Sequence, residues 1–174
     1  MPRGNGSIDD LDRKILAVLA FDGRATLQAI GDRVGLRRPA VHERLRRLER
    51  AGVVQGYRAD LDPAAVGAEV AAFVLLRIEG TGRDGNDCLA CCDRVARALR
   101  KLPGVLEFHT LAGSEDAVVK VRAADVRALE RLVMRDISGI PGVARVNTMV
   151  VLSTHFERPL ALPPPDAKPG RRRA

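Results

Sequence analysis

The chain lacks a hydrophobic run long enough to cross a membrane. Its purest apolar stretch, Val70–Ile78, has nine residues, whereas a membrane-spanning helix needs about 20. The first residues hold no apolar stretch either, so we expect no secretory signal. Neither a membrane protein nor a secreted protein is therefore predicted.

Cysteine and histidine are also scarce, with three of each. Cys88, Cys91 and Cys92 form an odd set that cannot make a disulfide framework, so a reducing cytoplasm is the simplest compartment. No histidine lies near them in the sequence and no second cysteine pair completes a tetrahedral set, so we predict neither a metal nor a cofactor. The three cysteines are interpreted as inert helix residues, with a redox-sensitive thiol as the alternative.

Positive charge is in excess, and it is unevenly placed. Lysine and arginine total 29 against 22 acidic residues, which gives a net charge of +7. Residues 1–61 carry a net +4, residues 62–157 a net −1 and residues 158–174 a net +4. An excess sorted in this way indicates a polyanionic partner. Residues 1–7 and the basic, proline-rich segment 158–174 are expected to be disordered.

Apolar residues make up 46% of the 174 positions, enough for the cores of two small domains or one large one.

Residues 8–61 begin with two short helices. Asp9 or Asp10 can cap the first, which ends at Gly23, where glycine tolerates a left-handed cap. Its buried stripe is Ile8, Leu11, Ile15, Val18 and Leu19. Thr26 can cap the second, which buries Leu27, Ile30 and Val34 before a tight turn at Gly35-Leu36.

The third helix is basic and begins near Arg38-Pro39, since proline loses nothing at a first helical position. It buries Val41, Leu45 and Leu48, and six arginines lie between Arg37 and Arg50. The β-type residues at 53–61 predict a small wing or hairpin. A short helix, a glycine turn and a basic helix are typical of a winged helix-turn-helix domain, whose basic helix enters the DNA major groove.

A solvated amphipathic helix is the alternative interpretation of these charges. In the helix-turn-helix interpretation, the contacts to double-stranded DNA come from the helix entrance and its outward face. The predicted DNA-binding residues are Arg37, Arg38, His42, Arg46 and Arg47. Arg44 lies close to the edge of the buried stripe, so we expect it to form an ion pair within the protein instead.

Residues 62–68 are interpreted as a linker, and residues 69–157 repeat a pattern of strand, helix and strand. The predicted strands are Val70–Ile78, Val105–Leu111, Ala117–Val121 and Val143–Phe156. The predicted helices are Cys88–Leu102 and Asp125–Ile137, the second with a buried stripe of Val126, Leu129, Val133 and Ile137. Both helices exit through Pro-Gly-Val, where proline stops the helix and glycine allows the turn. This βαββαβ order predicts an α+β fold with a C-terminal ferredoxin-like domain, an antiparallel sheet with helices on one face.

The first strand of that domain is apolar on both sides of the pleat. Val70, Ala72, Val74, Leu76 and Ile78 alternate with Ala71, Phe73 and Leu75. One side packs under the helices, and the other needs a cover. We therefore predict a homodimer in which a second copy packs against the sheet.

Several segments in a fixed order resemble the Lrp/AsnC family, the leucine-responsive or feast/famine transcriptional regulators. They are Ile8–Leu16, Asp22–Ala25, Val34–Leu36, Glu43–Glu49 and Gly52–Tyr57. The resemblance extends from Ile8 to about Phe156. It implies a winged helix-turn-helix joined to a ferredoxin-like domain that binds an effector and forms oligomers. It also implies dimers that assemble further, commonly as octamers, with an amino acid bound between dimers.

The resemblance places the effector at a Gly-x-x-Asp loop, matched by Gly113–Asp116, and at positions elsewhere in the second domain. The implied effector-binding residues are Thr110, Gly113, Asp116, Asp136, Met149, Val150 and Val151. A simple β-turn is the alternative interpretation of the loop. Two departures bear on specificity: Ala117 stands where relatives often have an aromatic residue, and Arg37 stands where they often have a capping serine.

The leading hypothesis is an amino-acid-responsive, sequence-specific DNA-binding regulator that is not an enzyme. The two-domain layout is similar to that of sirohaem decarboxylases, so a tetrapyrrole decarboxylase is the enzymatic alternative. Such chemistry would need cationic and histidine groups around a large pocket, and this chain offers only His42, His109 and His155. A ligand sensor that modulates a partner protein is a third hypothesis.

Overall fold

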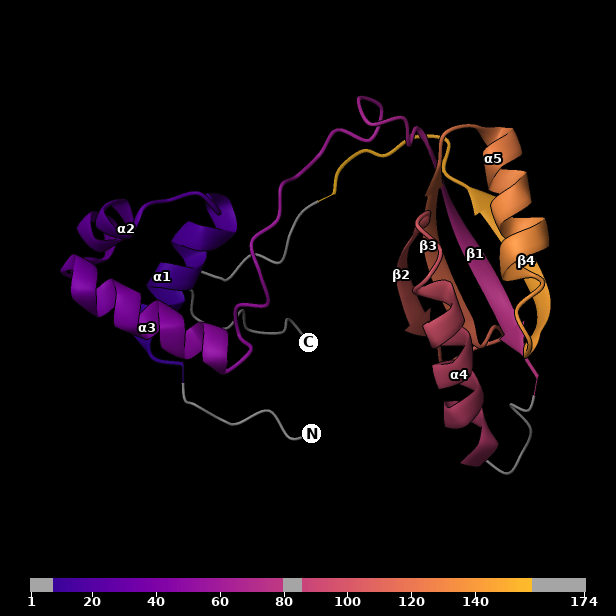
Figure 1. The fold of residues 1–174 in the computed structure, drawn as a ribbon, viewed down its shortest axis with the longest axis horizontal. Helices are drawn as coiled ribbons and strands as arrows, with labels where there is room; N and C mark the ends of the chain where they lie inside the picture. The colour runs from indigo at the N-terminus through magenta and orange to yellow at the C-terminus, as the bar shows by residue number, and fades with distance from the viewer. Residues whose placement is uncertain (1–7, 80–85, 158–174) are drawn as a thin grey trace, which may run out of the picture. The chain divides into compact units, whose positions relative to one another are not determined.

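The computed structural model describes residues 8–79 and 86–157. Residues 1–7 and 158–174, for which disorder is expected, lie outside the described residues. The chain forms two compact units, one reaching Asp60 and the other spanning Leu61–His155 (Figure 1). Over the described residues, no helix has the length and apolar character needed to span a bilayer.

The first unit consists of α1 (Asp10–Phe21), α2 (Leu27–Val34) and α3 (Arg38–Arg50). Asp9 caps α1 in a reciprocal capping box with Asp12, and the Thr26 hydroxyl accepts the Ala29 N–H at the start of α2. Pro39 lies in the first turn of α3. These caps confirm the predicted helix starts, because each satisfies backbone N–H groups that a helix leaves unpaired.

The core of this unit is small. Ile15, Ile30 and Val41, one from each helix, are fully buried, and partly buried apolar residues surround them. Gly35 ends α2 in the left-handed region with φ 73°, as the tight turn predicted. Leu45 and Leu48 of α3 are buried as well, which confirms the apolar stripe predicted for that helix.

Two predictions for this unit are wrong. Gly23 is not a left-handed cap: α1 ends at Phe21, and extended Asp22 closes the end by donating its N–H to the Val18 carbonyl. The wing is also missing, since none of the residues 53–61, all of them described, lies in a strand. Residues 53–61 pair with none of the four strands in the sheet of the described residues. Without a partner strand, a segment of β-type residues does not form a ribbon.

The second unit has the predicted βαββαβ order. Its elements are β1 (Val70–Ile78), α4 (Asn86–Leu99), β2 (Val105–Thr110), β3 (Ala117–Ala123), α5 (Val126–Arg131), η1 (Leu132–Ile137) and β4 (Val143–Val150). The sheet order is β2-β3-β1-β4, and neighbouring strands are antiparallel. This confirms the ferredoxin-like fold. The last strand ends at Val150 rather than Phe156, and the last helix continues from α5 into the π-helical turn η1.

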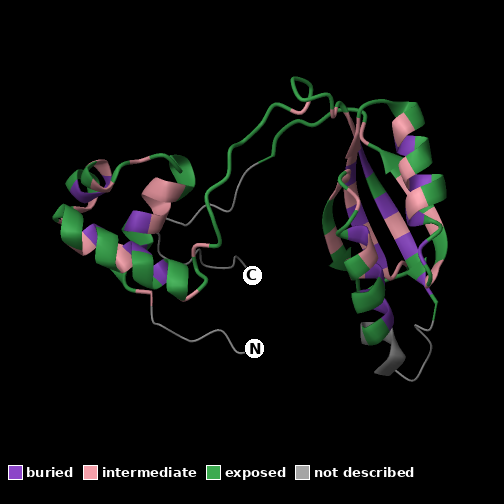
Figure 2. Cartoon of the chain, viewed as in Figure 1, coloured by how far each residue is buried: buried purple, intermediate pink, exposed green. Residues whose placement is uncertain are grey.

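Buried residues alternate with more exposed ones along β1, and this alternation distinguishes the two faces of the sheet (Figure 2). Ala72, Val74, Leu76 and Ile78 are buried with residues of α4, α5 and η1 in one core. Cys91 and Cys92 are buried in that core on α4, whereas the side chain of Cys88 lies outside the described residues. Val126, predicted to be buried, is 66% exposed, because the buried stripe begins one turn later at Leu129.

Candidate nucleic-acid interface and effector site

The outward face of α3 carries four of the five predicted DNA contacts without an internal partner. Arg37, Arg38, His42 and Arg46 are exposed, and no ion pair within the described residues holds any of them. Arg37 is the N-cap residue of α3, but its side chain makes no capping hydrogen bond. The start of α3 therefore offers free guanidinium groups beside the positive end of the helix dipole, an arrangement suited to DNA phosphates.

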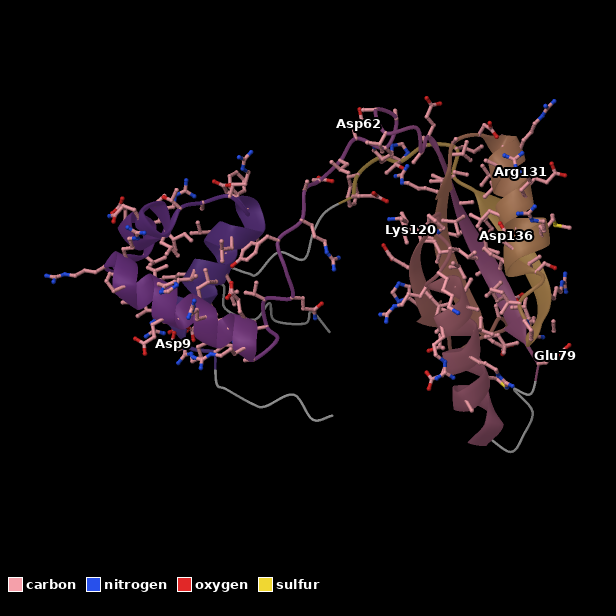
Figure 3. All side chains as sticks on the ribbon, in the orientation of Figure 1. Asp9, Asp62, Glu79, Lys120, Arg131 and Asp136 are labelled. Carbon is pink, nitrogen blue, oxygen red and sulfur yellow. The ribbon has the colours of Figure 1, made fainter. Side chains whose placement is uncertain are left out.

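Arg44 behaves differently, as the sequence predicted. Its Nη1 donates to Asp9 Oδ2 at 2.6 Å and to Asp12 Oδ1 at 2.9 Å. Both carboxylates belong to the start of α1, and Figure 3 shows Asp9 beside α3. The hydrogen bond from Arg44 lowers the pKa of Asp9, and the same contact raises the pKa of Arg44. Arg44 thus joins α1 to α3.

Arg47 also has an ion-pair partner within the protein, although the sequence predicted it only as a DNA contact. Its Nη2 lies 2.5 Å from Asp12 Oδ2, while its side chain remains 51% exposed. Asp12 is the one charged residue that is buried among the described residues. The spacing of Asp9 and Asp12 indicates a capping box, but no local pattern indicates the pair with Arg47, which lies 35 positions further along the chain.

The segment after α3 is fixed to the helix that it leaves. Gly52 has a left-handed backbone with φ 70°, and its N–H donates to the Glu49 carbonyl. This turn brings the Val53 N–H to the Leu48 carbonyl. The Tyr57 hydroxyl then donates to Glu49 Oε1 at 2.9 Å. Partial burial of the residue, which remains 50% exposed, and this hydrogen bond raise the pKa of Tyr57 to about 12. The chain therefore leaves the basic helix in a defined direction.

Six of the seven predicted effector residues fall into two groups near opposite ends of β1, and the seventh, Asp136, lies on η1. Thr110 pairs with Ala117, and Ala117 pairs with Leu76 near the end of β1. Met149 and Val150 pair with Phe73 and Ala72 near its start, and the Val151 N–H donates to the Ala71 carbonyl.

The two groups lie far apart within one chain. Four residues of β1 separate Ala72 from Leu76, roughly 13 Å at about 3.3 Å per residue. Across the sheet, Thr110 on β2 is about three strand spacings of 4.8 Å from Met149 and Val150 on β4, whereas Asp116, at the start of β3 and next to β1, is about two spacings from them. A single chain therefore does not bring them together around one small molecule.

The loop at Gly113 is held by Asp116. The Asp116 carbonyl accepts the Leu111 N–H, its N–H donates to the Leu76 carbonyl, and its Oδ2 accepts the Ile78 N–H at 2.8 Å. The loop thus closes between Leu111 and Asp116, and Gly113 at its tip is exposed. Asp136 lies on η1, on the helix side of the sheet (Figure 3), and its Oδ1 accepts a hydrogen bond from Arg135 Nε at 3.1 Å.

Comparisons with known proteins agree with this architecture. Residues 8–49 match the AsnC-type helix-turn-helix domain, and residues 71–161 match the Lrp/AsnC ligand binding domain. The HTH-type transcriptional regulator FL11 of Pyrococcus horikoshii is 36% identical over 86% of this chain and 93% of its own length. The HTH-type transcriptional regulator LrpA of Mycobacterium tuberculosis is 40% identical over 87% of this chain and 95% of its own.

A solved structure extends the likeness to three dimensions. The feast or famine regulatory protein of M. tuberculosis, complexed with L-methionine, superposes with a TM-score of 0.79 at 37% identity, covering 90% of this chain and all of that one. A helix-turn-helix unit followed by such a ligand-binding domain defines a DNA-binding transcriptional regulator. The chain belongs to the Lrp/AsnC family of these regulators.

Proposed function

We propose that this regulator recognises a specific DNA sequence through α3, with Arg37, Arg38, His42 and Arg46 as its principal contacts. The observation that carries the proposal is the exposed face of α3, where none of these four side chains forms an ion pair within the described residues. Residues at the start of a recognition helix contact base edges, and those further along contact the backbone. Arg37 and Arg38 therefore serve specificity, and Arg46 contributes a phosphate contact. We also propose a cytoplasmic location for this regulator.

Selection from a random-sequence duplex library with the full-length protein tests this proposal. We expect enrichment of a defined sequence, and we expect Arg38→Ala to weaken binding to that duplex by roughly 1–3 kcal/mol. Arg131→Ala, an exposed arginine on α5, is the matched control and leaves the affinity unchanged. Enrichment of no sequence, or equal effects of the two variants, would contradict the proposal.

We further propose a homodimer formed through the open face of the sheet, with assembly to octamers. Phe73 is 41% exposed on that face, where its neighbours across the strands are Lys120 and Met149. An apolar surface in the centre of a sheet is costly to leave in water, and a second sheet covers it. Two basic helices in such a dimer would reach half-sites about one helical turn apart.

An amino acid is the effector that we propose, bound where different chains meet. The support is the separation of Thr110, Gly113 and Asp116 from Met149, Val150 and Val151 within one chain. Residues so far apart can line one small site only if two chains contribute. A related structure binds L-methionine, so titration calorimetry begins with L-methionine, followed by other amino acids. Binding that persists unchanged in a monomeric variant would contradict a shared site.

We propose no enzymatic activity. A tetrapyrrole decarboxylase would need histidines around a pocket, whereas His42 lies on α3 and His109 Nε2 lies 3.1 Å from Glu107 Oε2 on β2. Purified protein with a tetrapyrrole absorbance band that releases CO₂ from substrate would overturn this conclusion.

A further inference from the structure

A fully buried carboxylate connects the first helix to the basic helix. Asp12 has no exposed side-chain surface, and its two oxygens contact different arginines of α3. Arg44 Nη1 lies 2.9 Å from Oδ1, and Arg47 Nη2 lies 2.5 Å from Oδ2. The two arginines stand three residues apart on one side of the helix, so a single carboxylate can reach both.

Arg44 and Arg47 differ in how much of the guanidinium group remains available to a partner outside the protein. The Arg44 side chain is 26% exposed, and its Nη1 is shared between Asp12 and Asp9. The Arg47 side chain is 51% exposed and contacts Asp12 through Nη2. A guanidinium group carries five N–H donors in a rigid plane, so Arg47 can be held by one edge while the rest of its donors face water. Arg44 serves the contact between helices, whereas Arg47 remains available to an outside anion.

We propose that Asp12 is a positioning residue for DNA binding, which holds Arg47 from the protein side so that its exposed donors meet a DNA phosphate. This inference rests on the proposed function of α3. It adds a residue from α1 that touches no DNA itself but sets the orientation of a side chain that does.

A backbone phosphate is the ligand that the position of Arg47 favours. Arg47 lies in the last turn of α3, and base contacts in this motif come from the beginning of the helix. A free arginine side chain loses considerable rotamer freedom when it binds. One that is already ordered by Asp12 loses less, which strengthens binding by roughly two- to tenfold for a single side chain.

The first test counts phosphate contacts through the salt dependence of binding. The probe is a duplex enriched from a random library by the unmodified full-length protein. We expect Arg47→Gln to lower the slope of log affinity against log salt by about 0.9 for each phosphate that the side chain no longer neutralises. Arg131→Gln, the same change of charge on exposed α5, is the control and leaves the slope unchanged. An unchanged slope in Arg47→Gln would overturn the inference.

The second test separates positioning from mere structural support by a double-mutant cycle. We expect Asp12→Asn to reduce the affinity for the enriched duplex by roughly two- to tenfold, and the affinity for a scrambled duplex by a similar factor, because a phosphate contact does not depend on sequence. In the Arg47→Gln background, the same substitution should have no further effect on the affinity for the enriched duplex. If Asp12→Asn still lowers the affinity in the Arg47→Gln background, Asp12 acts by stabilising the fold and not by positioning Arg47. That result would overturn the inference.

Folding is measured in parallel by circular dichroism, because Asp12 is buried and its substitution removes the charge that faces two arginines. If Asp12→Asn does not fold, Arg47→Gln and Arg47→Lys carry the test, since Arg47 is half exposed. Lysine keeps the charge but not the planar set of donors, so Arg47→Lys should retain the salt slope and bind more weakly. Equal affinity of the lysine variant would overturn the inference. Failure to enrich any duplex would count against the proposed function and not against the role of Asp12.

Discussion

At the scale of single residues, Gly31 is a position where the backbone leaves no space for a side chain. The Leu36 N–H donates to the Gly31 carbonyl at 3.0 Å, and a Cβ at Gly31 would overlap the Leu36 carbonyl oxygen. We expect Gly31→Ala to lower the free energy of unfolding of the first unit by roughly 1–3 kcal/mol, the usual cost of overpacking. Urea titration followed by circular dichroism measures this change.

Gly23→Ala is the matched control for that substitution. A Cβ there would lie 3.9 Å from the Leu19 carbonyl oxygen, an ordinary contact, and Gly23 has no positive φ. We expect its effect to stay within about 0.5 kcal/mol. If both glycines tolerated alanine equally, the close approach of the turn to α2 would not be a constraint on the sequence.

Tyr57 offers a second residue-scale prediction, because it is the only tyrosine in a chain without tryptophan. Burial, followed by the hydrogen bond to Glu49, raises its pKa to about 12 from the ordinary value of 10.0. The fold therefore favours the neutral phenol, and this contribution to stability is present below pH 10 and is lost as the pH rises towards 12.

Ultraviolet absorbance during alkaline titration reports the ionisation of Tyr57 directly. We expect Glu49→Gln to lower the pKa only part of the way, because burial is the larger cause of the shift. Titration in concentrated urea gives the unfolded reference. Ionisation of the native protein at the same pH as in urea would show that Tyr57 is not held against α3.

At the scale of secondary-structure elements, the ion pairs between α1 and α3 make the first unit sensitive to acid. The hydrogen bond from Arg44 lowers the pKa of Asp9 below its ordinary value of 3.8. Stability from this contact is therefore present above pH 3.8 and is lost as the pH falls through the lower pKa of the folded state. We expect the melting temperature of the first unit to fall across this range.

Thermal unfolding at a series of pH values checks this prediction, with Asp9→Asn and Asp10→Asn compared. Asp9→Asn removes the titrating partner of Arg44, so the acid dependence should become weaker. Asp10→Asn removes an exposed charge from the same turn without breaking that ion pair, and it should leave the acid dependence as it is. Equal pH profiles for the two variants would exclude Asp9 as the titrating group.

The elements that the sequence predicted well are those whose ends are set locally. Asp9, Thr26 and Pro39 define helix starts through contacts within one turn, and the bounds predicted for β1 agree with the structure. Two errors are local, the cap at Gly23 and the burial of Val126, and the others lie where distant residues decide. The wing lacked a pairing strand, and β4 stopped at Val150 because its partner β1 begins at Val70.

The same division applies to the candidate sites. The exposed residues of α3 follow from helical periodicity, which the sequence displays. The pairing of Arg47 with Asp12 depends on the packing of α1 against α3, which periodicity does not encode. The opposite placement of Thr110 and Met149 depends on strand order and register, which are set by the whole sheet.

At the scale of the whole molecule, the open face of the sheet is the surface through which we propose that two chains associate. Phe73 lies on β1, between β3 and β4, so it is central on that face. A carboxylate at this position would be desolvated in a sheet-to-sheet interface, which costs far more than leaving it in water. We therefore expect Phe73→Glu to prevent the proposed dimer from forming without unfolding the chain, because the residue is 41% exposed in the single chain.

Analytical ultracentrifugation measures the outcome against a chain mass of 18.8 kDa. Unmodified protein should sediment at a multiple of that mass and Phe73→Glu at the monomer mass. Phe21→Glu, at an apolar residue that is 89% exposed in the first unit, is the matched control and should keep the assembly. Monomeric Phe73→Glu should also bind a duplex with two half-sites more weakly while its affinity for one half-site stays the same, because each first unit keeps its own α3. An assembly that survives Phe73→Glu but not Phe21→Glu would move the interface from the sheet to the helical unit.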